Sequence, residues 1–309
     1  MMDSYTKKTK VWLDKRFKKR DRRGVYLAHN PIYGFLNNPD HIIGIESYSR
    51  TFQVMDALSR INFKTLLDVG GAEGYYPFVA REIFDAKCRN CDLSLEAGKR
   101  AKEIFGIESD FCDAHNLPYK DGQFDVVICS ETLEHVTNRE KAISELLRVA
   151  KKAVVICVPQ EPESAVIYNI KKKVPHGHIH SYNIKSFDYL KAVGYKVLTK
   201  RINSVFINIP DSLIRAKHIG FYVGRYPRIF FDIYNKILVI LKSKFSKRVL
   251  KLIFNVKIVE FLINVDGFVC KLTHLNHDIL VVIPKDPRLE LKKRRNIAPK
   301  DIIGLSVPV

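Results

Sequence analysis

The stretch of sequence that decides the fold reads TLLDVGGAEG and covers residues 65–74. Its first half is a short apolar run that includes Asp68, and its second half contains Gly70, Gly71 and Gly74. Glycine lets the backbone turn sharply and approach a ligand closely, and a helix that follows such a turn directs its N-terminal amide groups toward the same ligand. The stretch therefore predicts a buried strand, a ligand-binding turn and a helix.

Apolar strands and helices alternate outward from this stretch. Further strands are expected at residues 88–91, 109–112, 124–129, 153–158, 195–198 and 278–283, and helices at 48–58, 76–84, 95–105, 139–150 and 184–193. Near-continuous apolar strands that alternate with helices are typical of a parallel sheet covered on both faces. The expected fold is therefore α/β, with a doubly wound, mostly parallel sheet of seven strands and a helical insertion before the last strand. In such sheets ligands bind at the carboxyl ends of the strands.

The same pattern divides the chain into five parts. These are a basic N-terminal arm with helices at 1–63, the ligand-binding core at 64–203, a helical basic insertion at 204–277, the last core strand at 278–284, and a basic tail at 285–309.

Composition narrows the class of protein and its surroundings. The chain of 309 residues is 46% hydrophobic and 28% charged, which excludes a collagenous or disordered protein. Six cysteines are too few for a disulfide scaffold, so we expect reduced thiols. We find no run of apolar residues long enough to span a bilayer and no apolar core of a signal peptide near the N-terminus. These features predict a cytoplasmic protein, with peripheral contact to a membrane as an option.

Charge is distributed unevenly. The net charge of +19 divides into +6 over residues 1–63, −3 over 64–158 and +16 over 159–309. Basic surfaces attract anionic partners such as nucleic acid, anionic lipid or phosphorylated sugar carriers, although lysines also serve solubility alone.

Acidic residues stand at the ends of three successive predicted strands. Asp68 lies at the end of the first, Asp92 ends the second and Asp113 ends the third. A carboxylate at the second position can accept hydrogen bonds from two ribose hydroxyls, and one at the third can receive an adenine amino group. Any one of these acids could instead be a turn or cap residue, but together they indicate a pocket for an adenosine without a phosphate.

With these residues in place, the chain resembles the class I S-adenosylmethionine-dependent methyltransferases over roughly residues 66–198, and within them type 11-like enzymes that methylate glycans and small molecules. The resemblance rests on LLDVGGAEG, on the block FCDAHNLPYKDGQFDVVICSETLEHV and on VVICVPQEP. It implies that S-adenosyl-L-methionine is the cofactor and that a Rossmann-like methyltransferase fold holds it. The implied cofactor-binding residues are Asp68, Gly70 and Gly74 in the turn, Asp92 and Leu93 at the ribose, Asp113 and Ala114 at the adenine, and Ser130 beside the donor.

Two departures from related patterns matter. Ala72 stands where many members of the family have glycine. The spacing G-x-G-x-x-G of dinucleotide enzymes is absent, because Ala72 and Tyr75 occupy two of its positions. A dehydrogenase is therefore disfavoured.

Methyl transfer requires alignment of donor and acceptor and, for some acceptors, removal of a proton. Candidate bases follow the fourth and fifth strands: Glu131 and His135 in one segment, and His178 and His180 in the other. If the segment His176-Gly177-His178-Ile179-His180 is extended, its three imidazoles lie on one side. Neutral histidine has a pKa suited to this role.

The spacing of Glu131, Glu134 and His135 also suggests a metal site completed by one later histidine. A similar E-x-x-E-H arrangement occurs in some RNA-end 2′-O-methyltransferases and ubiquinone-pathway O-methyltransferases, and carboxylate and imidazole ligands suit Mg²⁺, Mn²⁺ or Zn²⁺. The alternative is that His135 is a structural residue at a helix start. Cys88 and Cys91 have the spacing of a zinc motif but lie in a predicted strand without a second pair, so we expect no site there.

The methyl acceptor is left open between three hypotheses. The first is a hydroxyl of a small molecule or sugar, either free or linked to a lipid; the second is RNA; the third is a non-catalytic protein that binds S-adenosylmethionine. Residues 248–265 have an apolar face that is too wide for an ordinary surface helix. This segment either packs on the core as a lid or lies on an anionic membrane.

Overall fold

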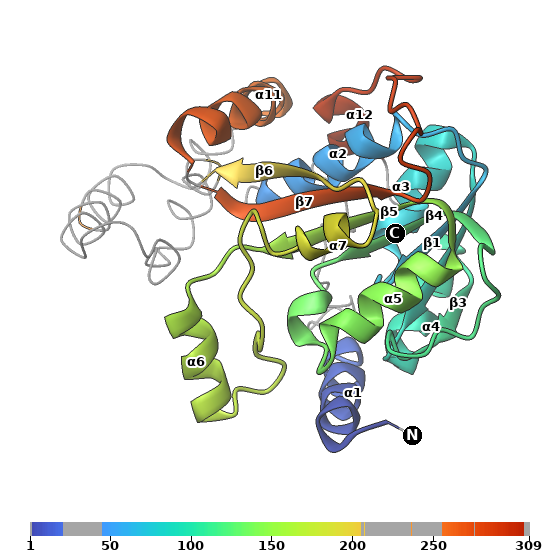
Figure 1. Cartoon of the computed structure of the whole chain (residues 1–309), viewed down its shortest axis with the longest axis vertical. Helices are drawn as coiled ribbons and strands as arrows, with labels where there is room; N and C mark the ends of the chain where they lie inside the picture. The colour runs from blue at the N-terminus through green and yellow to red at the C-terminus, as the bar shows by residue number, and fades with distance from the viewer. Residues whose placement is uncertain are drawn as a thin grey trace.

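The computed structural model describes residues 2–20, 45–204, 207, 236, 255–274 and 276–305. Its centre is a sheet of seven strands in the order β3-β2-β1-β4-β5-β7-β6 (Figure 1). The strands are β1 (Thr65–Val69), β2 (Lys87–Asp92), β3 (Ser109–Phe111), β4 (Phe124–Ser130), β5 (Ala150–Pro159), β6 (Leu198–Ser204) and β7 (Asn276–Pro284). Only β7 runs against its neighbours. The predicted seven-stranded, mostly parallel α/β sheet is confirmed.

Helices cover both faces of the sheet. They are α1 (Ser4–Phe17), α2 (Ile45–Leu58), α3 (Tyr75–Phe84), α4 (Leu95–Phe105), the short 3₁₀ turn η2 (Leu133–His135), α5 (Arg139–Val149), α6 (Glu163–Lys172), α7 (Tyr189–Ala192), α11 (Val256–Thr273) and α12 (Pro299–Ile303). Alternate strand residues enter two separate cores, so that Val126 packs with α2 and α3 whereas Val127 packs with α5. Burial on both faces explains why these strands are almost uniformly apolar.

The edge of the sheet differs from the sequence-based prediction. The strand expected at 195–198 is instead β6 at Leu198–Ser204, and the helix expected at 184–193 is reduced to α7 after a series of turns. β6 is polar and partly exposed because it pairs with β7 alone, so it lacks the apolar signature of a central strand.

The C-terminal part of the chain also differs from the expected basic tail. Ile297, Ile302 and Ile303 are buried in the core near α2, and α12 packs on α2 and α11. Within the predicted segment 248–265, residues 248–254 lie outside the described residues, and the rest belongs to α11 and its N-cap. That helix buries Val259 and Ile263 and exposes Phe261.

No helix in the described ranges combines the length and the hydropathy that crossing a bilayer requires.

Candidate active site

A cavity of about 370 Å³ lies at the carboxyl ends of β1, β2 and β4. Its wall includes the three strand-end acids of the prediction, Asp68, Asp92 and Asp113. The rest of the lining comes from helices α1 and α2 and from the segments that follow the strands, and it includes Thr6, Thr9, Leu13, Phe17, Arg50, Gly70, Gly71, Ala72, Leu93, Cys112, Ala114, His115, Ser130, Glu131, His135 and His176. The sheet thus gathers the acids around one space, as the order of strands required.

The turn after β1 has a backbone that favours glycine. Gly70 and Gly74 have φ of +75° and +78°, and a Cβ on Gly71 would overlap the side chains of Asp68 and Asn90. Ala72 also has a positive φ, +49°, so the departure from glycine at this position is accommodated at some conformational cost. Gly74 does not line the cavity, because it forms the N-cap of α3.

Asp68 and Asp92 form an acidic pair in the floor of the cavity. Burial raises the pKa of Asp68 to about 8, and the nearby Asp92 adds to the shift. Within the described residues, Asp68 Oδ2 accepts no hydrogen bond. Burial likewise raises the pKa of Asp92, to about 6, although its carboxylate accepts hydrogen bonds from the amides of Ala72 (2.9 Å) and Ser94 (2.7 Å). A ligand with hydroxyl or ammonium donors would satisfy these carboxylates.

Asp113 closes another part of the wall. Partial burial disfavours its ionisation, but hydrogen bonds from the His115 ring and amide outweigh it and lower the pKa of Asp113. Ala114 lies beside it in the cavity wall. Asp113 is therefore a fixed acceptor beside a small apolar surface, which suits the amino edge and face of a purine.

Glu131 follows β4 and lines the cavity. It has a positive φ of +54°. The guanidinium of Arg50 from α2 lies 3.4 Å from Glu131 and 2.9 Å from Asp278 of β7. Burial raises the pKa of Glu131, although the positive charge of Arg50 works in the other direction. Arg50 was not singled out from the sequence, because an arginine in a helix gives no signal of where it points.

The predicted histidines divide into two groups. His135 lines the cavity and its ring stacks on His176, with centroids 3.7 Å apart. His178 and His180 are absent from the lining: Nδ1 of His178 lies 2.8 Å from Glu161 Oε2, and Nε2 of His180 donates to the Val136 carbonyl. The expected extended segment does not form, because His176 has a φ of +52° that breaks the alternation. Among the described residues, His178 and His180 thus both lie outside the cavity lining, whereas His135 and Glu131 lie within it.

A cluster of metal-ligating groups includes His135 of the cavity lining. Glu134, His135 and His178 each offer an atom within 4.8 Å of the others. Glu134 is fully buried, neither of its carboxylate oxygens accepts a hydrogen bond within the described residues, and burial raises its pKa to about 7. Glu131, the other predicted ligand, instead groups with Cys157 and Asp278.

Helix α1 roofs the cavity, which the sequence did not reveal. Its whole buried face, Thr6, Thr9, Leu13 and Phe17, lines the cavity. The helix is attached on several sides: Asp14 accepts a hydrogen bond from Ser94, Tyr5 donates to the Gly177 carbonyl, and Trp12 stacks on His176. The helical spacing of these four residues is the signal in the sequence that could have indicated a helix with one buried face.

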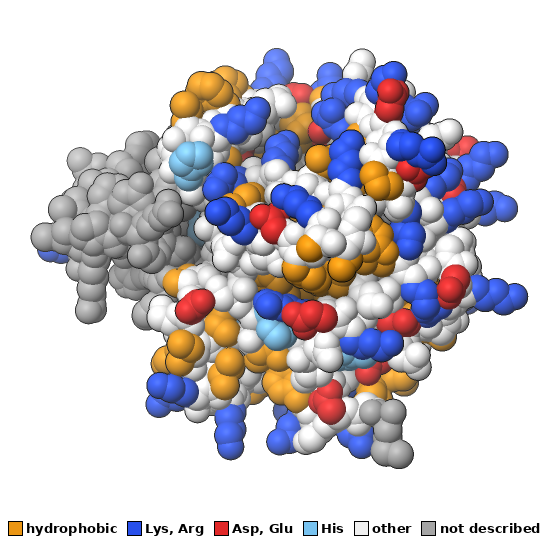
Figure 2. Space-filling model, in the orientation of Figure 1, with side chains coloured by type: hydrophobic (Ala, Val, Ile, Leu, Met, Phe, Trp, Pro, Cys, Tyr) orange, Lys and Arg blue, Asp and Glu red, His pale blue; other side chains and the backbone are white. Residues whose placement is uncertain are grey.

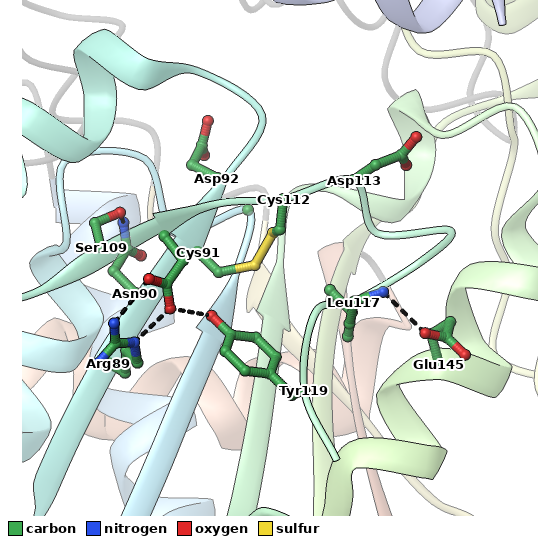
Figure 3. The surroundings of a disulfide bond; sticks show 12 residues. Arg89, Asn90, Cys91, Asp92, Ser109, Cys112, Asp113, Leu117, Tyr119 and Glu145 are labelled. Atoms are coloured by element: carbon green, nitrogen blue, oxygen red, sulfur yellow. Dashed lines mark hydrogen bonds and ion pairs between the residues drawn. A yellow bond between two sulfur atoms is a disulfide. The ribbon is translucent and has the colours of Figure 1, made fainter. Parts of the chain in front are cut away.

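A disulfide joins Cys91 at the end of β2 to Cys112 just after β3, so the expectation that all six cysteines are reduced is wrong for this pair. Asp92 and Asp113 are the next residues in the chain, and Figure 3 shows both carboxylates on the same side of the bond. The two sulfurs come together because β2 and β3 are parallel neighbours. The spacing of 21 residues gave no sign of this pairing in the sequence.

Comparisons with known proteins agree with the geometry. Residues 67–158 match the family described as methyltransferase domain. Norajmaline N-methyltransferase of Rauvolfia serpentina is 41% identical over 103 residues, which are 31% of this chain and 35% of that protein. Tocopherol O-methyltransferase of Arabidopsis thaliana is 33% identical over 114 residues, 34% of this chain and 32% of that protein.

Among solved structures, phosphoethanolamine N-methyltransferase 2 of Haemonchus contortus, in complex with S-adenosyl-L-methionine, shares the fold. It has a TM-score of 0.54 at 15% identity and covers 91% of this chain and 60% of that one. This chain spans about a third of the length of the curated relatives it matches. The match at residues 67–158 supports a class I S-adenosylmethionine-dependent methyltransferase domain in this part of the chain.

Proposed function

We propose that the protein binds S-adenosyl-L-methionine in the cavity and transfers its methyl group to a hydroxyl of a small molecule or sugar, either free or linked to a lipid, in the cytoplasm or at a membrane surface. The observation that carries the proposal is that Asp68, Asp92 and Asp113 line one cavity beside the turn at Gly70. The methionine ammonium would lie near Asp68, the ribose hydroxyls at Asp92 and the adenine at Asp113 and Ala114. Leu93 would contact the nucleoside, and Ser130 would lie beside the donor.

Two further residues in the cavity lining support a hydroxyl as the methyl acceptor. A hydroxyl must lose its proton during transfer, whereas a neutral amine attacks the methyl group with its lone pair. Glu131 and His135 both line the cavity and can take such a proton. Arg50 holds the Glu131 carboxylate in place, so it acts as a positioning residue.

The activity is tested with donor labelled in its methyl group. The purified protein is incubated with fractionated cell extract, and label is followed into small molecules, lipids, polysaccharide, RNA and protein. The proposal expects label in a small-molecule, glycan or lipid fraction, bound through oxygen and therefore released as methyl iodide by hydriodic acid under milder conditions than methyl groups on nitrogen require. Label confined to RNA would overturn the acceptor, and donor binding without any transfer would point to a non-catalytic binding protein.

Donor affinity is expected to depend on pH through Asp92. Both of its oxygens act purely as acceptors only when the group is ionised, because protonation turns one of them into a donor, and burial raises the pKa of Asp92 to about 6. Through Asp92, affinity for S-adenosylhomocysteine should therefore change little above pH 7, where only the titration of Asp68 would contribute, and fall progressively as the pH drops through 6, by about tenfold per pH unit well below it. Calorimetric titrations across this range measure the effect. An affinity that rises on acidification would contradict this role of Asp92.

We further propose that Glu134, His135 and His178 hold a divalent metal ion. The residues fit one: Nδ1 of His178 lies 2.8 Å from Glu161, which orients the ring with Nε2 as its ligand atom, and Nδ1 of His135 lies 3.4 Å from the Gly177 carbonyl. His135 Nε2 is already 3.8 Å from Glu134. A bound ion would lower the pKa of an acceptor hydroxyl that it contacts.

The metal site is tested by binding rather than by activity. Calorimetric titration with Mn²⁺ or Zn²⁺ should give one site, and Glu134→Gln or His178→Ala should weaken it at least tenfold. His180→Ala is the matched control, because His180 lies in the same loop and donates to the Val136 carbonyl. Equal metal affinity in all four proteins, or none in the unchanged protein, would exclude the site.

A further inference from the structure

Helix α6 presents an apolar surface to solvent although it follows directly on the core strand β5. Ile167 and Ile170 lie three residues apart on α6 and are 48% and 53% exposed, and Val174, which follows the C-cap of the helix, is 36% exposed. Tyr168 beside them is 59% exposed, and Val166 is the only buried residue of the helix. Single exposed apolar residues are common, but four exposed apolar residues within eight positions give this short segment an unusually apolar surface.

Cations lie next to these apolar residues. Lys171 and Lys172 are exposed in the last turn of α6, and Lys173, its C-cap, is exposed as well. In Figure 2 hydrophobic and basic side chains lie next to each other over the region where Figure 1 labels α6. No ion pair is recorded for these lysines among the described residues.

From this combination we infer that α6 is a docking helix for the surface of an anionic lipid bilayer. A helix that lies in a bilayer surface has exposed apolar side chains on one side and lysines that reach the headgroups. Interfaces between proteins are instead depleted of lysine at their core. The charge therefore favours anionic lipid over a second protein as the occupant of this surface.

The place of α6 in the chain links docking to the cavity. His176, which lines the cavity, follows Val174 by two residues, and the Gly177 amide donates to the Val174 carbonyl. The Asn169 side chain donates a hydrogen bond to the His178 carbonyl, so α6 is joined to the loop that carries His176, His178 and His180. Docked through α6, the protein would hold the acceptor side of its cavity near the bilayer, where a lipid-linked acceptor would be found; this last step rests on the proposed function.

The inference is tested with the full chain and sedimenting vesicles, without any acceptor. The protein should bind vesicles that contain phosphatidylglycerol and phosphatidylcholine, and should bind pure phosphatidylcholine vesicles at least tenfold more weakly. Ile167→Ser combined with Ile170→Ser, and separately Lys171→Gln combined with Lys172→Gln, should each weaken partitioning to anionic vesicles about tenfold or more. Both pairs are exposed, so the variants should fold.

Phe268→Ser is the matched control, because Phe268 is an equally exposed apolar residue on α11 and is 63% exposed. Its partitioning should stay unchanged. Binding that is unaffected by the α6 variants, that is lost in Phe268→Ser alone, or that is absent altogether would overturn the inference. Self-association of the protein through α6 without binding to vesicles would also overturn the inference. Titration of the same preparations with S-adenosylhomocysteine separates this failure from a failure of the proposed function.

Discussion

Replacing Asp92 by alanine is expected to weaken binding of S-adenosylhomocysteine about a hundredfold or more. The substitution removes a carboxylate that would accept hydrogen bonds from both ribose hydroxyls, and hydrogen bonds to a charged group contribute about 1.5–3 kcal/mol each. Calorimetric titration measures the affinity. Because Asp92 also accepts hydrogen bonds from Ala72 and Ser94, the melting temperature is recorded to show that the variant is folded.

Asp121→Ala is the control for this prediction. Asp121 is an exposed acid that pairs with Arg148 and lies outside the cavity lining. Its substitution should leave donor affinity unchanged. If Asp92→Ala and Asp121→Ala bind the ligand equally well, the ribose is not held by Asp92.

Reduction of the Cys91–Cys112 bond is expected to lower the free energy of unfolding by about 3 kcal/mol, because the bond closes a loop over a sequence separation of 21 residues. Denaturation by urea with and without a dithiol reductant measures the difference. Donor affinity should fall in parallel, since the bond fixes the residues that precede Asp92 and Asp113.

The double variant Cys91→Ala with Cys112→Ala should be insensitive to the reductant, whereas Cys88→Ala, which removes a free thiol, should respond as the unchanged protein does. Two free thiols at positions 91 and 112 in the purified, non-reduced protein would contradict the pairing.

The sequence was informative wherever one local pattern determines the structure. The apolar runs at β1, β4 and β5 indicate a parallel sheet, because burial on both faces leaves few choices of residue, and the acids at or just after the ends of β1, β2 and β3 indicate its ligand-binding edge. The position of Asp68, Asp92 and Asp113 around one cavity follows from strand order, so it could be predicted before the structure.

Features that depend on contacts between distant segments could not be predicted. The roof formed by α1 brings Trp12 against His176, and the disulfide depends on the register of β2 against β3. The extended conformation expected for residues 176–180 was not found for a different reason. The positive φ of His176 is a backbone conformation that no side-chain pattern indicates. The position of β6 was predicted wrongly, because a strand at the edge of the sheet has one neighbour and lacks the apolar sequence of a central strand.

The central claim is that the strand-end carboxylates grip the nucleoside of a sulfonium donor, and diffraction from crystals grown with S-adenosylhomocysteine tests it most directly. The account predicts density in the cavity under α1, with both ribose hydroxyls at Asp92 and the adenine beside Asp113 and Ala114. Crystals in which that cavity stays free of ligand at saturating concentration, or in which the nucleoside lies elsewhere, would contradict it.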